Sequence, residues 1–135
     1  MLVRTCLIAV CIAATLLVGG CNDSAVVPVT GKVIFHSRER PEHCRLTFVP
    51  VEGSTDGPIR PNGATMQADG TYQMAPYQGV EGLLPGRYIV RVSYYDLKPG
   101  GNPDREADWI EYTHEGSELV VEPGAGSVEH DVEVP

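Results

Sequence analysis

The chain has 135 residues, and its 18 acidic side chains outnumber the 10 basic ones to give a formal net charge of −8 at pH 7. No cluster of lysines and arginines interrupts this acidity, which excludes nucleic acid and anionic lipid headgroups as expected partners of the protein surface. The 15 glycines and 11 prolines lie at short intervals and break any helical period, so the composition favours short strands in a single domain.

The first twenty residues, MLVRTCLIAVCIAATLLVGG, are typical of a signal peptide. Arg4 precedes an uncharged apolar run that ends in small residues directly before Cys21, and the run is shorter than the ~20 residues of a membrane-spanning helix. The segment LLVGGC resembles the lipobox of bacterial lipoproteins. This resemblance implies lipid transfer to Cys21, cleavage before it and acylation of the new amino group. The alternatives are an uncleaved anchor and an ordinary secretory signal followed by a chance cysteine.

These features divide the chain into three parts. Residues 1–20 form the signal peptide, residues 21–27 the lipidated cysteine with a short tether, and residues 28–135 one domain. Because two or three acyl chains hold a protein stably where one does not, we expect attachment to a bacterial cell membrane. The domain then faces the periplasm or the exterior.

Alternation of apolar and polar side chains recurs along the domain and predicts strands. The DG turn at Asp69 and Gly70 is a strong hairpin signal, because both residues tolerate positive φ. About six or seven short strands with regular turn signals predict an antiparallel sandwich or barrel. The alternating segments, in chain order, are 29–36, 44–50, 64–74, 87–95, 118–122 and 127–134.

Cys44 is the only cysteine left after removal of the signal peptide and lipidation of Cys21, so the mature domain has no intrachain disulfide. It shares strand parity with Leu46 and Phe48, which predicts a small buried hydrophobic side chain. A free nucleophile and an intermolecular disulfide are the alternatives. His43 points to the opposite face and does not activate the thiol.

The segment NPDREADWIEY, residues 102–112, breaks the alternation. Asn102 as an N-cap and Pro103 at the first helical position predict one helical turn or an ordered loop before Trp109.

The acids of this loop are weak candidates for calcium ligands. They are spaced as positions 1, 3, 5 and 12 of an EF-hand-like loop. However, Trp109 stands where that loop needs a glycine, and Glu111 stands where it needs an apolar residue. We therefore predict an acidic, solvated loop rather than a metal site. The four candidates are Asp104, Glu106, Asp108 and Glu115.

Four segments in a fixed order carry a family resemblance: VTGKVIFHSRERPEHCRLTFVPVEG, ATMQADGTYQM, GLLPGRYIVRVSY and SELVVEPGAGSVEHDVEV. Over residues 29–134 the chain resembles small lipoproteins, frequent in planctomycetes, that carry a carboxypeptidase-regulatory-like or transthyretin-like domain. The resemblance implies a seven-stranded, antiparallel Greek-key β-sandwich of the prealbumin type. The chain departs from the family pattern in the segment HSRERPEHC and in the acidic loop. It implies little about activity, because a fold does not fix a function.

Catalytic motifs are missing from the sequence, which has no G-x-S-x-G, H-E-x-x-H, C-x-x-C or phosphate-cradling glycine loop. The transthyretin fold also hosts the hydrolase of 5-hydroxyisourate, but this chain ends HDVEVP and lacks the C-terminal Y-R-G-S of that enzyme. We predict a non-catalytic structural or binding module without a cofactor, which meets an envelope protein or a glycan. The alternatives are a calcium-stabilised binding module that uses residues 102–115 and, more remotely, a transthyretin-fold hydrolase.

Aromatic side chains supply the candidate partner contacts, because their amphipathic rings are enriched in interfaces and sugar sites. Tyr88 and Tyr94 have core parity and are predicted to be structural. The alternative role for the four candidates is packing at the edge of the sandwich. They are Tyr77, Tyr95, Trp109 and Tyr112.

Overall fold

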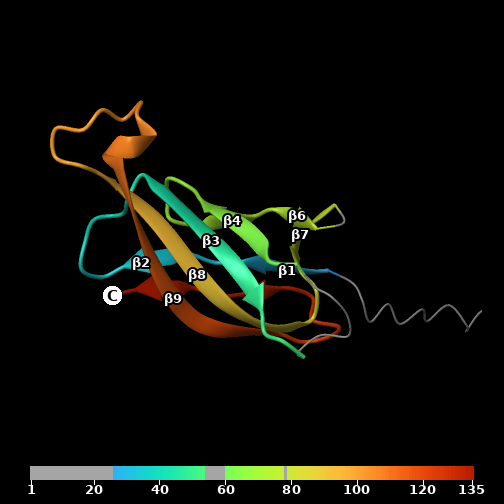
Figure 1. Cartoon of the computed structure of the whole chain (residues 1–135). Helices are drawn as coiled ribbons and strands as arrows, with labels where there is room; N and C mark the ends of the chain where they lie inside the picture. Colours follow the sequence, from blue (N-terminus) through green and yellow to red (C-terminus); the bar gives the residue numbers. More distant parts are fainter. Residues whose placement is uncertain (1–25, 54–59, 78) are drawn as a thin grey trace, which may run out of the picture.

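The computed structural model describes residues 26–53, 60–77 and 79–135. The signal peptide, the lipidation site Cys21 and most of the tether lie outside these residues. The described chain is all-β, as predicted, and its strands form two facing layers (Figure 1). The elements are β1 (Val27–Thr30), β2 (Val33–Phe35), β3 (His43–Pro50), β4 (Asn62–Met66), β5 (Tyr72–Met74), β6 (Pro76–Tyr77), β7 (Val80–Leu83), β8 (Gly86–Leu97), the 3-10 turn η1 (Glu106–Asp108), β9 (Trp109–Val121), β10 (Val128–Glu129) and β11 (Val132–Val134).

One layer is a five-stranded antiparallel sheet in the order β5-β4-β3-β8-β9. The DG hairpin joins β4 to β5 as predicted, with Gly70 at φ 90°. Alternation along the central strands sends one set of side chains inward. Leu46 lies opposite Val92, and Phe48 lies opposite Val90, so the buried residues of β3 and β8 form adjacent rows.

The second layer consists of a four-stranded sheet, β10-β1-β7-β6, and a two-stranded sheet, β11-β2. The pairs β1–β10 and β2–β11 are parallel, so the prediction of a purely antiparallel sandwich is wrong at these two places. The physical reason is that alternation along one strand reports only which face is buried. It carries no information about the direction of the neighbouring strand, which here comes from the far end of the chain.

Gly31 lies where the first and last strands of the domain approach most closely. A Cβ atom at Gly31 would lie 2.0 Å from the carbonyl oxygen of His130. The backbone N–H of His130 donates to the Thr30 carbonyl at 2.8 Å. From the facing sheet, the Tyr72 hydroxyl donates to the His130 carbonyl at 2.7 Å. The strand is interrupted at His130, between β10 and β11, but these two hydrogen bonds still satisfy the N–H and the carbonyl of that residue.

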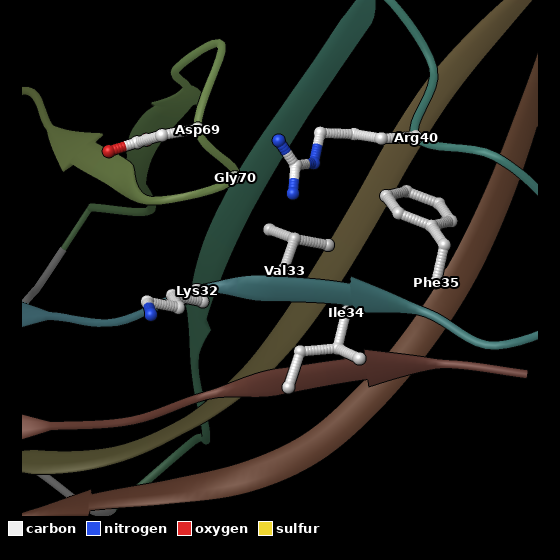
Figure 2. A pocket seen from close by; sticks show the side chains of 7 residues that line it. All are labelled: Lys32, Val33, Ile34, Phe35, Arg40, Asp69 and Gly70. Atoms are coloured by element: carbon white, nitrogen blue, oxygen red, sulfur yellow. The ribbon is translucent and has the colours of Figure 1, made fainter.

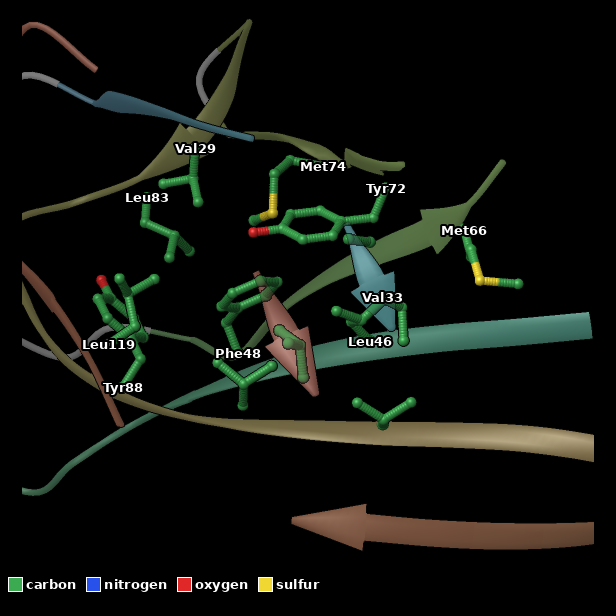
Figure 3. Close-up of a cluster of buried hydrophobic side chains, with 14 of the residues drawn as sticks. Val29, Val33, Leu46, Phe48, Met66, Tyr72, Met74, Leu83, Tyr88 and Leu119 are labelled. Atoms are coloured by element: carbon green, nitrogen blue, oxygen red, sulfur yellow. The ribbon is translucent and has the colours of Figure 1, made fainter. Parts of the chain in front are cut away.

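The hydrophobic core fills the space between the layers (Figure 3). Tyr88 and Phe48 are its largest fully buried side chains, and the Phe48 ring centre lies 5.8 Å from that of Tyr72. The buried Tyr88 hydroxyl donates to the Leu84 carbonyl at 2.7 Å. Its polar end is therefore satisfied while its ring contributes apolar area to the core.

The β8–β9 hairpin extends beyond the second layer and carries the loop 98–108 at its tip (Figure 1). β9 is an edge strand, since β8 is its one partner among the described strands. A bulge interrupts this pairing, because Ile89 lies opposite Glu118 whereas Arg91 lies opposite Glu115. Two residues of β9, Gly116 and Ser117, therefore oppose one residue of β8, which bends and twists the edge.

The close approach at Gly31 predicts a large effect of a small substitution. We expect Gly31→Ala to lower the free energy of unfolding by roughly 2–4 kcal/mol, because the new methyl group would overlap a backbone carbonyl and force the strands apart. The midpoint of urea denaturation, followed by circular dichroism, measures the loss. Gly63→Ala is the matched control, since its Cβ would meet only the Leu46 carbonyl at 3.8 Å. Equal midpoints for the two variants would contradict the role given to Gly31.

The thiol of Cys44 is buried, as predicted, with 6% of the residue exposed. Burial raises its pKa to about 11, so at pH 8 the reactive thiolate is about a hundredfold scarcer than for an exposed cysteine. We expect a disulfide reagent to leave the native protein unlabelled for minutes and to label it in denaturant. The Cys44→Ser variant assigns that label. Rapid labelling of Cys44 in the native protein would overturn this expectation.

Candidate binding surface on the β8–β9 hairpin

A shallow groove of ≈ 400 Å³ lies on the outer face of the five-stranded sheet, toward the tip of the β8–β9 hairpin. It combines two aromatic rings with hydrogen-bond donors and acceptors. Its lining residues are His43 and Arg45 from β3, Tyr95 from β8, Glu106 from η1, and Trp109 and Glu111 from β9.

The strand register brings these residues together. His43 lies opposite Tyr95 on the neighbouring strand, and Tyr95 in turn lies opposite Glu111. These three side chains therefore form a row across β3, β8 and β9 on one face of the sheet. Cys44, the next residue along β3, points into the core, which keeps His43 on the outer face as predicted.

Trp109 closes one side of the groove and is held in place by two contacts. Its indole Nε1–H donates to the Pro103 carbonyl at 3.0 Å. Its ring centre lies 4.9 Å from that of His43, with the planes inclined at 75°. Since β8 lies between β3 and β9, this contact shows that the indole reaches across β8. The aromatic wall is thus positioned before any ligand arrives.

The loop 98–108, which includes Pro103, holds the indole in place and is itself fixed by internal hydrogen bonds. The Asp108 carboxylate accepts a hydrogen bond from the Asn102 N–H at 2.9 Å, and the Asp108 carbonyl accepts one from the Lys98 N–H at 2.8 Å. A helical turn forms before Trp109, as predicted, but it begins later, at Glu106. The Asn102 side chain accepts instead from the Asp104 N–H, which makes a local turn rather than a helix cap.

Charges on the outer face are paired near the base of the hairpin and unpaired near its tip. Arg87 and Glu118 approach to 2.6 Å, and Arg91 and Glu115 approach to 3.2 Å. In the groove, by contrast, neither Glu106 nor Glu111 forms an ion pair with any residue that the structure describes, and the same holds for Arg45. The groove therefore offers two carboxylates and one guanidinium to an incoming molecule.

Tyr95 lies on the floor of the groove between these charges. Burial raises the pKa of its phenol, and the hydrogen bond to Glu111 and the charge of that carboxylate raise it further. The phenol therefore stays neutral and keeps its proton, with its O–H as the hydrogen-bond donor toward Glu111. This leaves the ring face and the remaining carboxylate lone pairs for other contacts.

Tyr112, another predicted contact residue, lies on the opposite face of the hairpin. Its ring stacks on that of Tyr94, with centres 5.4 Å apart and planes inclined at 17°. The Arg38 guanidinium covers the Tyr94 ring at 4.9 Å and binds both carboxylate oxygens of Asp96. These hydrogen bonds hold the pKa of the Asp96 carboxyl below its usual value. This inner-face cluster fastens the loop before β3 to the hairpin, and Tyr112 serves that packing.

The remaining candidates from the sequence lie apart from the groove. Tyr77 belongs to β6 in the second layer and is half-buried opposite Val80. Of the calcium candidates, Asp108 is bonded within its loop, and Glu115 is paired with Arg91 on the sheet. Across residues 26–53, 60–77 and 79–135, no three His, Cys, Asp or Glu side chains converge as metal ligands would.

A second, smaller hollow of ≈ 220 Å³ lies between β2 and the DG turn (Figure 2). Arg40 projects into it from the loop before β3, and its guanidinium donates to the Ala68 carbonyl at 2.6 Å. The same group packs against Gly70, where a Cβ atom would lie 2.9 Å from it. Arg40 thus binds the hairpin turn, which gives this hollow a structural explanation.

Sequence reasoning found the two aromatic residues of the groove and one of its acids, but it missed His43, Arg45 and Glu111 as site residues. His43 and Arg45 carried a usable signal, because both stand at outward positions of a strand whose inward positions are apolar. Glu111 carried none, since its role depends on the pairing of β9 with β8.

Comparison with protein-family models, with curated proteins and with solved structures gave no match to this chain. Among the described residues, no helix has the length and apolar character needed to cross a membrane.

The support of Trp109 by its loop can be tested with Asp108→Ala. We expect acrylamide to quench the fluorescence of Trp109, the single tryptophan of the chain, more strongly in this variant, because loss of the bond to Asn102 loosens the segment that holds the indole. The free energy of unfolding should fall by less than about 1 kcal/mol, since the bond is exposed. Asp104→Ala is the control, and equal quenching in both variants would refute the support.

Proposed function

We propose that this protein is a lipid-anchored bacterial lipoprotein whose non-catalytic β-sandwich acts as a binding module at the cell envelope. In this proposal Cys21 carries the lipid, and the groove around Tyr95 and Trp109 meets the partner. The finer fold assignment, a Greek-key sandwich of the transthyretin-like kind, belongs to the same proposal, although the described residues form eleven strands where the sequence resemblance implies seven. It is supported by the two parallel pairs, β1–β10 and β2–β11, which continue one another across the close contact at Gly31.

The polarity of the domain is the observation that carries the proposal. Val27 begins β1 six residues after Cys21 and lies opposite Leu83, at the same end as the start of β8. From there β8 runs 12 residues to Leu97, which is roughly 40 Å at ~3.3 Å per residue. Figure 1 shows the loop 98–108 at the opposite end of the molecule from the start of β1.

This polarity fits a displayed binding surface. A lipid on Cys21 would hold the end of the sandwich where β1 begins close to the bilayer, because the tether of residues 21–27 is short. The groove would then point away from the membrane, toward other components of the envelope. The net negative charge fits the same arrangement, because an acidic domain is not attracted to anionic lipid headgroups and would not lie against the membrane surface.

The anchor is tested by Cys21→Ala. We expect the wild-type protein to sediment with membranes and the variant to move largely to the soluble fraction or to accumulate with its signal peptide, because only a thiol forms the thioether to the lipid. Mass spectrometry of the N-terminal peptide reports the acylation directly. Cys44→Ala is the matched control and should stay with the membranes, since Cys44 is buried in the core. Unchanged sedimentation and mass in the Cys21 variant would refute the proposal.

A further inference from the structure

We infer that the groove on the outer face of the β8–β9 hairpin binds a glycan whose sugar units carry free amino groups. The inference rests on the proposed function, because it names the partner of the displayed surface. It draws on three features of the groove: its aromatic wall and floor, its mixture of donors and acceptors, and its unpaired carboxylates.

The lining of the groove matches the surface of a sugar ring. A pyranose has an apolar face of C–H groups, which the rings of Trp109 and Tyr95 can cover, and a rim of hydroxyl groups that both donate and accept hydrogen bonds. Arg45 lies beside the rings and offers several N–H donors, and the carboxylates of Glu106 and Glu111 are acceptors. The groove is open and shallow, so it can take a unit within a longer polymer.

The position of the groove favours a glycan over an extended peptide. Peptides that add to a sheet bind through unpaired main-chain groups at an edge. This groove instead lies on the face of β3, β8 and β9. The main-chain groups of β3 and β8 are already used, because each strand has a partner on either side, and β9 lines the groove through the side chains of Trp109 and Glu111. A ligand here meets side chains, which is all that a sugar requires.

The charges of the groove select an amino sugar among glycans. Glu106 and Glu111 face the groove without an ion pair among the described residues, whereas Glu115 and Glu118 on the same strand are each paired with an arginine. Arg45 supplies one positive charge against these two carboxylates, so a protonated amino group would balance the remaining negative charge. It would also be attracted to the faces of the neighbouring aromatic rings. An acidic polysaccharide would meet two carboxylates against one guanidinium, that of Arg45, and would be disfavoured by the net negative charge.

Trp109 provides the readout, since it is the only tryptophan in the chain and forms one side of the groove. The full-length lipidated protein in detergent micelles is titrated with a hexamer of β-1,4-linked glucosamine while Trp109 emission is recorded. The fully N-acetylated hexamer and hexalysine are titrated in parallel. The first removes the positive charges but keeps the sugar rings, and the second keeps the charges but removes the rings.

The decisive variant is Glu111→Gln, which removes one groove carboxylate with little change of shape. We expect it to weaken binding of the glucosamine hexamer about tenfold, the loss typical of one charge-assisted contact. Glu115→Gln is the matched control, because Glu115 lies on the same strand and face but is paired with Arg91 outside the groove. It should bind as the wild-type protein does. Thermal unfolding curves verify that both variants fold.

Saturable binding of the glucosamine hexamer, at least about fivefold tighter than that of either comparison ligand and weakened only by Glu111→Gln, supports the inference. Equal affinity for the N-acetylated hexamer overturns the amino selectivity. Equal affinity for hexalysine overturns the claim that the groove recognises a sugar ring. If no probe gives a saturable change in Trp109 emission, the claim that the groove is a binding site is overturned. None of these negative results affects the fractionation of the Cys21→Ala variant, so failure of the glycan and failure of the membrane anchor are told apart.

Discussion

The close parallel pairing of the first and last strands of the domain is the constraint on which the rest of the structure depends. It requires Gly31, since any side chain there would collide with the main chain at His130. The Tyr72 hydroxyl reaches this point from the facing sheet and binds the His130 carbonyl, so one tyrosine ties the second layer to the first. With both layers fixed, the apolar rows of β3 and β8 are sealed from water, and the β8–β9 hairpin has a rigid base from which it projects.

The aromatic side chains on the projecting part of the hairpin are packed differently on its two faces. The second layer reaches its inner face through Phe35, at the end of β2. There Phe35 contacts Tyr94 with ring centres 5.3 Å apart, Tyr112 stacks on Tyr94, and Arg38 covers the cluster while it binds Asp96. On the outer face no other strand among the described residues covers the sheet, and Trp109 folds across β8 and leaves a groove beside it. Packing on one side thus stiffens the surface that the other side presents.

How much of this the sequence predicts depends on whether a feature is local. Alternation within one strand predicts the buried Cys44 and the outward His43, and the DG turn predicts its hairpin, because each depends on a few neighbouring residues. The long strand β9 was predicted only at its end, residues 118–122. From Trp109 to Glu118 it is an edge strand with exposed or half-exposed residues on both faces, and such a strand shows no alternation. The parallel pairs and the groove depend on register between distant segments, which no single segment encodes.

The edge strand β9 is poorly suited to pairing with another strand, which favours binding at the face of the sheet rather than at its edge. An exposed edge invites pairing with a second copy, and β9 carries two features that oppose it. The bulge at Gly116 and Ser117 breaks the regular spacing of its main-chain groups. In an antiparallel pair of two copies centred on Thr113, Glu111 of one copy would also lie opposite Glu115 of the other, and like charges in that position are destabilising. Glu111 therefore acts twice, since the carboxylate that discourages self-pairing along the edge is also the unpaired charge that the groove presents to a cationic ligand.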